Sequence, residues 1–154
     1  MRTIRRVLFV VVMLLALAPI TVFAGTKNPY KDVTRKKVDA QSYKSIVYIK
    51  TTFNGWRALV KKGKLYPNKA MTRREFLLVL HEGWGDKVTV TMDDVRHAND
   101  IVTSKFVCNR MVELARKLNY PIKWNGNKTK LKRKDVARYI YIFATFNTAL
   151  APKK

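Results

Sequence analysis

The sequence has few of the residues that carry covalent or metal chemistry. It contains one cysteine, Cys108, and two histidines, His81 and His97, among 154 residues. A single cysteine excludes a disulfide within the chain, so the fold must be held together by packing. The apolar neighbours Phe106 and Val107 indicate that Cys108 is a small core residue rather than a nucleophile, with an intermolecular bridge as the alternative.

Signatures of the common enzyme classes are also missing. The sequence has no glycine-rich phosphate loop and no nucleophile elbow. Asp93 and His97 are four residues apart and would share a helix face as metal ligands, but an acid at a helix start is the simpler interpretation. Nothing fixes the separation that a glycosidase pair of Glu75 with Glu82 or Asp86 would require. We therefore expect a protein that is not an enzyme, without metal or cofactor.

Acidic residues are scarce. The chain has 10 of them against 32 lysines and arginines, a formal net charge of +22. Such a charge disfavours a compact state through self-repulsion and makes an anionic partner or surface the natural expectation. The charge alone does not identify the anion.

Long apolar runs occur only at the N-terminus. Three arginines within residues 2–6 precede an apolar stretch at 7–18, Pro19 interrupts it, and small residues at the cleavage-determining positions end at Ala24. This pattern predicts an export signal over residues 1–24 and places the protein in the periplasm, on the cell surface or outside the cell. An uncleaved anchor is the alternative, because residues 7–24 are almost long enough to span a bilayer.

The remaining 130 residues have the length of one domain. The first 24 residues hold three basic residues and no acidic one, so the rest carries 29 basic against 10 acidic residues, or +19. Residues 25–41 are basic and polar with no apolar period, and we expect them to form an extended leader or linker. Residues 42–152 are the expected folded domain.

The strongest helix-start signal lies at the end of the stretch 63–76. Thr72 is a good N-cap, and Glu75 stands three residues later, where its carboxylate can reach back to the N–H of the cap. Met71 and Phe76 occupy the two positions of a hydrophobic staple. The segment is therefore predicted to be helix, tight loop, helix.

The same pattern of apolar residue, cap, acid and apolar residue occurs twice more. The two later sets are Val90, Thr91, Asp94 and Val95, and Leu131, Lys132, Asp135 and Val136. The last is weaker, because lysine is a poor cap. Residues 71–80 align without a gap on residues 131–140, which indicates a degenerate internal repeat of about 60 residues, with halves at about 42–90 and 91–150.

Apolar spacing predicts helices over most of the domain. We expect helices at about 43–62 and 72–83, two helices within 92–118 that are separated near Ser104, and a last helix from about 132 to 150. Residues 87–90 alternate briefly, but we interpret them as a loop because a single short strand has no partner. The predicted fold class is all-α, with helix-loop-helix units in one small domain.

The stretch 63–76 resembles the S-layer homology (SLH) module. The residues that carry this resemblance, in register, are Gly63, Leu65, Pro67, Asn68, Met71, Thr72, Arg73, Glu75 and Phe76. Residues 92–95, Met-Asp-Asp-Val, are similar to the Phe-x-Asp-Val that opens such modules. The copy at 63–76 is good, with Met71 in place of isoleucine and Arg74 in place of a small residue. The second copy is degenerate and lacks the Pro-Asn pair, the threonine and the glutamate.

The resemblance implies a helical module that holds proteins at the bacterial cell surface by binding anionic, often pyruvate-bearing, wall polysaccharide. In that family the threonine and arginine of the motif line the ligand groove. These roles would carry over to Thr72 and Arg73, and in the second copy only Arg133 matches.

The residues themselves also point to anion binding. Two clusters of cations stand at predicted helix starts, Lys61, Lys62, Lys64, Lys69, Arg73 and Arg74 in one and Lys123, Lys128, Lys130, Lys132, Arg133 and Lys134 in the other. Free N–H groups and the helix dipole favour an anion at such starts. Trp84 and Trp124, each beside a glycine, are candidates for stacking on a sugar ring or base, with burial in the core as the alternative.

We therefore expect an exported, non-enzymatic protein that binds an anionic cell-wall polymer or another acidic envelope component. The candidate ligand contacts are Lys69, Thr72, Arg73, Arg74, Trp84, Trp124, Lys132 and Arg133. A nucleic-acid-binding protein is the first alternative, since the charge suits it although an export signal argues against it. A small wall-active hydrolase and a partner of an acidic protein are the others.

Overall fold

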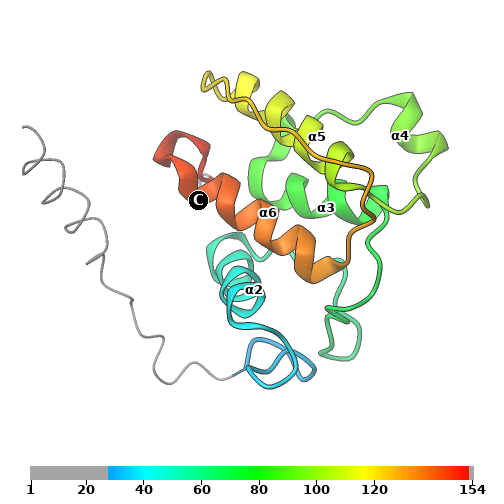
Figure 1. The fold of residues 1–154 in the computed structure, drawn as a ribbon, viewed down its shortest axis with the longest axis vertical. Helices are drawn as coiled ribbons and strands as arrows, with labels where there is room; N and C mark the ends of the chain where they lie inside the picture. Colours follow the sequence, from blue (N-terminus) through cyan, green and yellow to red (C-terminus); the bar gives the residue numbers. More distant parts are fainter. Residues whose placement is uncertain (1–27, 153–154) are drawn as a thin grey trace, which may run out of the picture.

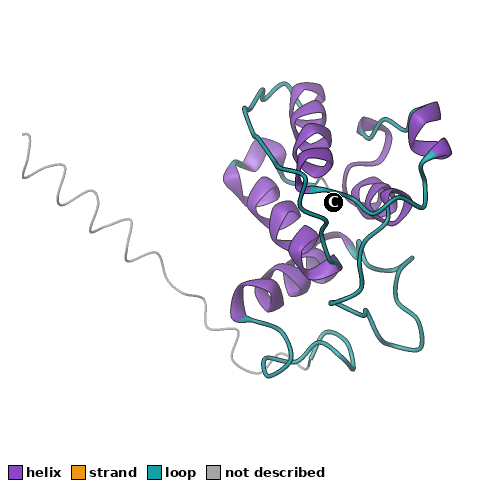
Figure 2. Ribbon diagram, turned by 45° about the vertical axis from the view of Figure 1, so that its right-hand side comes forward, coloured by secondary structure: helices purple, strands orange, loops and turns teal. Residues whose placement is uncertain are grey.

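A computed structural model describes residues 28–152, and the export signal predicted at 1–24 lies outside them. The described residues form an all-α fold without a strand, as the sequence predicts (Figures 1 and 2). The elements are α2 (Ala40–Phe53), α3 (Arg73–Trp84), the 3-10 turn η1 (Gly85–Lys87), α4 (Met92–Arg96), α5 (Ser104–Lys117), α6 (Arg133–Phe146) and the 3-10 turn η2 (Thr148–Leu150).

Helix α2 is shorter than the sequence predicts. It ends at Phe53 rather than near residue 62, and the C-cap Asn54 adopts a left-handed conformation with φ 53°. At Gly55 a Cβ atom would lie 2.9 Å from the side chain of Ile49, so the chain needs glycine to turn back there. Trp56 and Leu59 still face the core, but from the turns that follow the helix.

The segment 28–38 belongs to the folded body, which corrects the expectation of an extended leader. Tyr30, Val33 and Val38 are buried, and the Lys50 ammonium donates a 2.6 Å hydrogen bond to the carbonyl of Pro29. The apolar residues of this segment are too widely spaced to show a helical or strand period. They are held by side chains from elsewhere in the chain.

Helix α3 begins as predicted. Thr72 and Glu75 form a capping box, and Met71 and Phe76 are fully buried. The helix does not stop by Gly83 but continues to Trp84. The absence of a side chain at Gly83 lets the ring of Phe53 pack there, about 3.1 Å from where a Cβ would be.

The predicted break near Ser104 separates α4 from α5. Thr91 and Asp94 form a capping box at the start of α4, as predicted. Val90 and Val95, however, remain 57% and 59% exposed, so they do not form a buried staple. The loop ahead of α4 makes no β-bridge among the described residues, as expected for residues 87–90.

Helix α6 begins at Arg133, where Asp135 accepts a hydrogen bond from the N–H of Lys132. It ends at Phe146, before the predicted boundary, and Leu150 reaches the core from η2. Helix α6 packs along α2 (Figure 1). Cys108 is buried as predicted, and this burial raises the pKa of its thiol.

The starts of α3, α5 and α6 meet in a closed ring of backbone hydrogen bonds. Met71 N–H donates to the carbonyl of Leu131, Leu131 N–H to that of Val102, and Val102 N–H to that of Met71, at 3.1, 3.0 and 2.9 Å. We call this junction of the three helix starts and the segments before them the hub, and Met71, Leu131 and Val102 its hub residues. All three side chains are buried.

Two further sets of hydrogen bonds repeat the threefold pattern of the hub. The first residues of α3, α5 and α6 donate to the carbonyls of Asp100, Thr129 and Lys69. The second residues, Arg74, Lys105 and Lys134, donate to the carbonyls of Ala98, Asn127 and Pro67. Each acceptor lies two or four residues before its own hub residue, so the three segments are equivalent in backbone geometry.

This arrangement refines the predicted repeat. Met71 and Leu131 occupy equivalent positions, as the alignment of 71–80 with 131–140 predicts. The third equivalent residue is Val102 rather than Val90. The search for a cap followed by an acid misses Val102, because the third residue of α5 is Phe106. The third residues of α3 and α6 are Glu75 and Asp135.

Candidate anion-binding site

The two predicted basic clusters approach each other at the hub through residues 67–69 and 133–134. Arg133 N–H donates to the carbonyl of Lys69 and Lys134 N–H to that of Pro67, both at 3.0 Å. The loops that carry the clusters are therefore neighbours. Their helix starts, however, do not offer the free N–H groups from which the sequence predicts an anion site.

The N–H groups at these helix starts are already satisfied. The first and second N–H groups of α3, α5 and α6 donate to carbonyls of a neighbouring hub segment. The third is taken by the hydroxyl of Thr72 in α3, the hydroxyl of Thr103 in α5 and the carbonyl of Lys132 in α6. A helix start binds an anion through unpaired N–H groups, so these three starts are poor anion sites.

Arg133 lies inside the protein, which does not fit the prediction that it contacts a ligand. Its side chain is 3% exposed and donates to the carbonyls of Leu59 and Leu65 and, at 2.8 Å, to the carboxylate of Glu75. Its Nε has no partner among the described residues. We interpret Arg133 as a buried link between α6 and the loop that precedes α3.

Glu75 accepts the hydrogen bond from Arg133, and its surroundings favour the ionised carboxylate. Its carboxylate also accepts from Lys69 Nζ at 3.0 Å and from Thr72 N–H at 3.3 Å. Burial raises the pKa of Glu75, but the bonds from Arg133 and Lys69 outweigh burial, so the pKa lies below its ordinary value of 4.5.

Thr72 and Arg73 are also engaged within the fold. The Thr72 hydroxyl caps α3, and the Arg73 guanidinium forms a 2.9 Å ion pair with Asp93 of α4. The same guanidinium lies over the ring of Phe106, 4.7 Å from its centre. The side chain of Arg73 is 21% exposed, so only one edge of it faces solvent.

Of the predicted basic contacts, Arg74, Lys132 and Lys69 remain on the surface. Arg74 and Lys132 are exposed and form no ion pair with a described residue. Lys69 is exposed as well, although it pairs with Glu75. These three side chains are spread over the two loops rather than gathered around one cavity.

Trp84 and Trp124, the two tryptophans predicted to contact a ligand, differ in their surroundings. Trp84 is buried between Phe53 and Phe143, and its indole N–H donates a 3.0 Å hydrogen bond to the carbonyl of Leu150, so it is a core residue. Trp124 is half-buried and stacks on Tyr139 with 5.6 Å between ring centres. Neither presents a free ring in a hollow of the surface.

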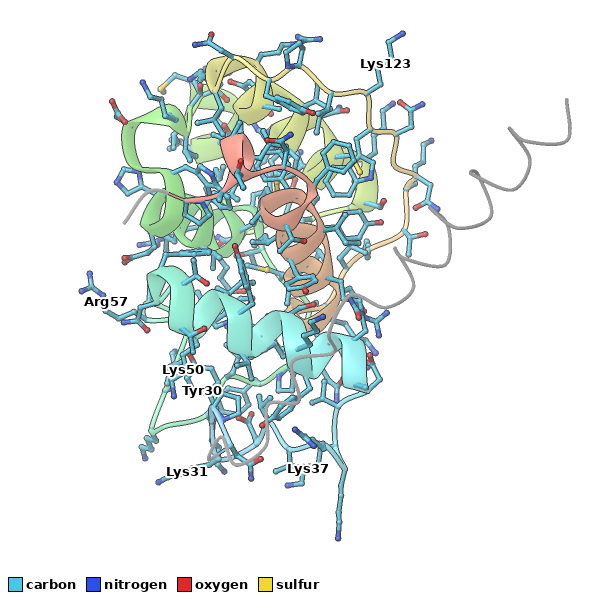
Figure 3. All side chains as sticks on the ribbon, turned by 90° about the vertical axis from the view of Figure 1, so that its left-hand side faces the viewer. Tyr30, Lys31, Lys37, Lys50, Arg57 and Lys123 are labelled. Carbon is cyan, nitrogen blue, oxygen red and sulfur yellow. The ribbon has the colours of Figure 1, made fainter. Side chains whose placement is uncertain are left out.

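A group of unpaired cations lies at the end of the molecule formed by residues 31–37 and 61–64. Lys31 N–H donates a 3.0 Å hydrogen bond to the carbonyl of Gly63 and joins the two loops. We call this surface the lysine end, and it comprises Lys31, Lys36, Lys37, Lys61, Lys62 and Lys64. All six side chains are exposed, and none forms an ion pair with a described residue. Figure 3 shows Lys31 and Lys37 together at this end, with Lys123 at the opposite end.

A hollow of about 460 Å³ borders the lysine end. Its lining consists of Asp32, Lys37, Tyr66, Pro67, Asn68 and Lys69. Tyr66 is 43% exposed and has φ 57°, a conformation that residues other than glycine rarely adopt. The carboxylate of Asp32 stabilises it by accepting from the N–H groups of Leu65 and Tyr66 at 2.9 and 2.7 Å. Strained backbone of this kind is common at ligand sites.

The sequence analysis missed the residues that build this hollow from the N-terminal side, Asp32 and Lys37. A signal exists for Asp32 alone, because residues 30–33 read Tyr-Lys-Asp-Val and residues 92–95 read Met-Asp-Asp-Val. The first copy stands in a segment that was expected to be a leader. Its aspartate holds a loop 33 residues away, a contact that no local pattern reveals.

Within residues 28–152 there is no cluster of three or more His, Cys, Asp or Glu side chains suited to a metal ion. None of the helices in this part of the chain is both long enough and apolar enough to cross a bilayer. Comparisons of the chain with protein-family models, with curated proteins and with solved structures gave no match.

Proposed function

We propose that this chain is an exported, non-enzymatic protein that binds an anionic polymer of the cell envelope through its lysine end. The observation that carries the proposal is the set of six exposed lysines that pair with no carboxylate of residues 28–152. The nearby acid, Asp32, is occupied by two backbone N–H groups. Lysines act as mobile point charges, which suits a polymer with repeated charges more than one small anion with fixed geometry.

The hollow beside the lysine end supports a polymer that contains sugar rings. Tyr66 offers an exposed aromatic face, Asn68 an amide, and Lys37 and Lys69 two cations around the same space. An aromatic face combined with hydrogen-bonding groups suits the apolar face and hydroxyl groups of a sugar. The resemblance of residues 63–76 to a module that binds wall polysaccharide points to the same class of ligand.

Co-sedimentation with purified cell-wall sacculi tests the proposal. The triple variant K31Q/K37Q/K64Q should bind about tenfold more weakly, on the scale of about 0.5 kcal/mol for each charge removed. The matched control is R96Q/R116Q/K123Q, which removes the same charge from exposed side chains elsewhere. The control should lose much less binding.

Three outcomes would contradict the proposal. Equal losses in the two triple variants would mean that net charge acts without a site. Absence of pelleting by the unmodified protein would exclude the sacculus as the partner. Tighter binding to duplex DNA than to sacculi, with a steep loss in salt, would favour a nucleic-acid partner.

A further inference from the structure

An apolar groove lies between α3 and α4, far from the lysine end. Its volume is about 590 Å³, within the range of small-molecule sites, and Arg74, Leu77, Leu78, His81, Val90, Asp94, Val95 and Ala98 line it. Helix α4 stands away from the other helices at one side of the molecule (Figure 1). The groove is the space that this separation leaves.

The walls of the groove expose large apolar side chains to solvent. Leu78 on α3 is 39% exposed, while Val90 and Val95 on the opposite wall are 57% and 59% exposed. Apolar side chains that face one another across an open groove are unfavourable in water and gain free energy when an apolar chain fills the space. The groove is therefore suited to an extended hydrocarbon.

The charged groups around the groove favour an anion at one end of that hydrocarbon. Arg74 and His81 flank Leu78 on the same face of α3, four and three residues away, and Arg74 forms no ion pair with a described residue. The only carboxylate in the lining, Asp94, is 2% exposed, forms an ion pair with Arg110 and accepts hydrogen bonds from Thr91. A free guanidinium beside an apolar groove matches a carboxylate with an alkyl chain.

We propose that this groove binds a monomeric long-chain carboxylate, with the alkyl chain between Leu78 and Val95 and the carboxylate at Arg74. This site is separate from the lysine end and does not depend on polymer binding there. A free amphiphile is a better match than a membrane surface. Asp86 and Asp100 are exposed beside α4, form no ion pair with a described residue and would be repelled by anionic lipid headgroups.

Titration calorimetry with laurate tests the proposal. The protein is the chain without its predicted export signal, and laurate is kept below the concentration at which it forms micelles. Laurate should bind with one-to-one stoichiometry. Dodecanol should bind about tenfold more weakly because it lacks the charge, and acetate should not bind detectably because it lacks the chain. Dodecyltrimethylammonium should bind more weakly than dodecanol.

Matched variants locate the ligand. Arg74→Gln should reduce laurate affinity about tenfold and leave dodecanol affinity unchanged, while Leu78→Ser combined with Val95→Ser should weaken both ligands. Arg116→Gln and Ile142→Ser are the controls, since both side chains are exposed outside the groove, and neither should change binding. All substituted positions are on the surface, and circular dichroism verifies folding.

The proposal is overturned if laurate does not bind, if the Leu78/Val95 double variant binds it as tightly as the unmodified protein, or if Arg74→Gln affects laurate and dodecanol equally. Binding to anionic phospholipid vesicles without binding to monomeric laurate would replace it with a membrane-surface site.

Discussion

The hub and the lysine end are both built from basic loops, yet they use their charges in opposite ways. At the hub, Arg133 and Arg73 are paired with Glu75 and Asp93, and the helix-start N–H groups are satisfied by backbone carbonyls and caps. At the lysine end, six lysines have no carboxylate partner among the described residues. A basic residue at a helix start is therefore not by itself evidence of an anion site.

The hub itself shows how equivalent backbone positions diverge. Arg73, Ser104 and Arg133 are each the first residue of their helix and donate the same backbone hydrogen bond. Arg133 is enclosed, Arg73 is partly open beside Asp93, and the Ser104 hydroxyl lies 2.7 Å from the hydroxyl of Tyr139. The backbone hydrogen bonds between the three segments are therefore equivalent, whereas the side chains of their first helical residues have different surroundings.

The largest expected effect on stability comes from removing the buried arginine. Arg133→Met should lower the free energy of unfolding by about 3–5 kcal/mol, because it leaves Glu75 and two carbonyls without their buried partner. Arg73→Met is the matched control at the equivalent position. Its ion pair with an exposed Asp93 contributes about 0–1 kcal/mol. Urea denaturation measures both, and similar losses would show that the two arginines are equivalent after all.

A smaller loss is expected where the segment before Leu131 lies against the start of α5 at Gly126. At Gly126 a Cβ atom would lie 2.6 Å from the backbone nitrogen of Lys105, which cannot move without breaking its hydrogen bond to the carbonyl of Asn127. Gly126→Ala should cost about 2 kcal/mol of unfolding free energy. Asn125→Ala, at an exposed neighbouring residue, should change little. A neutral effect of Gly126→Ala would indicate that the hub segments dock loosely.

The smallest expected effect is on how the free energy of unfolding depends on pH. We expect Glu75 of the hub to contribute to this dependence and the lysine end not to. The pKa of Glu75 is lower in the folded protein than its ordinary value, so its ionised form stabilises the fold above about pH 4.5. That contribution is lost as the pH falls below this value and the carboxylate is protonated. Glu75→Gln should flatten this part of the pH profile of thermal unfolding, whereas K31Q/K37Q/K64Q should leave its shape unchanged.

Local signals in the sequence predict the helix starts well. The caps at Thr72 and Thr91 depend on residues within three positions of one another, and the burial of Met71 and Leu131 follows from apolar spacing. The all-α class follows from the same local patterns. These predictions succeed because the interactions behind them are short in sequence.

Contacts between residues far apart in the sequence explain the features that local sequence patterns do not predict. Arg133 is buried by carbonyls of Leu59 and Leu65, 74 and 68 residues earlier, and nothing near Arg133 distinguishes it from a surface arginine. Asp32 likewise turns a predicted leader into part of the candidate site through a loop 33 residues later. The lysine end exists only because these distant segments fold onto one another.

We propose that the unpaired lysines, and not the paired arginine of the helix start, hold the anionic polymer. The most direct test is sacculus binding by Lys37→Gln beside Arg73→Gln, two single variants that each remove one positive charge. We expect the greater loss of affinity for Lys37→Gln. A greater loss for Arg73→Gln would contradict it and return the site to the start of α3.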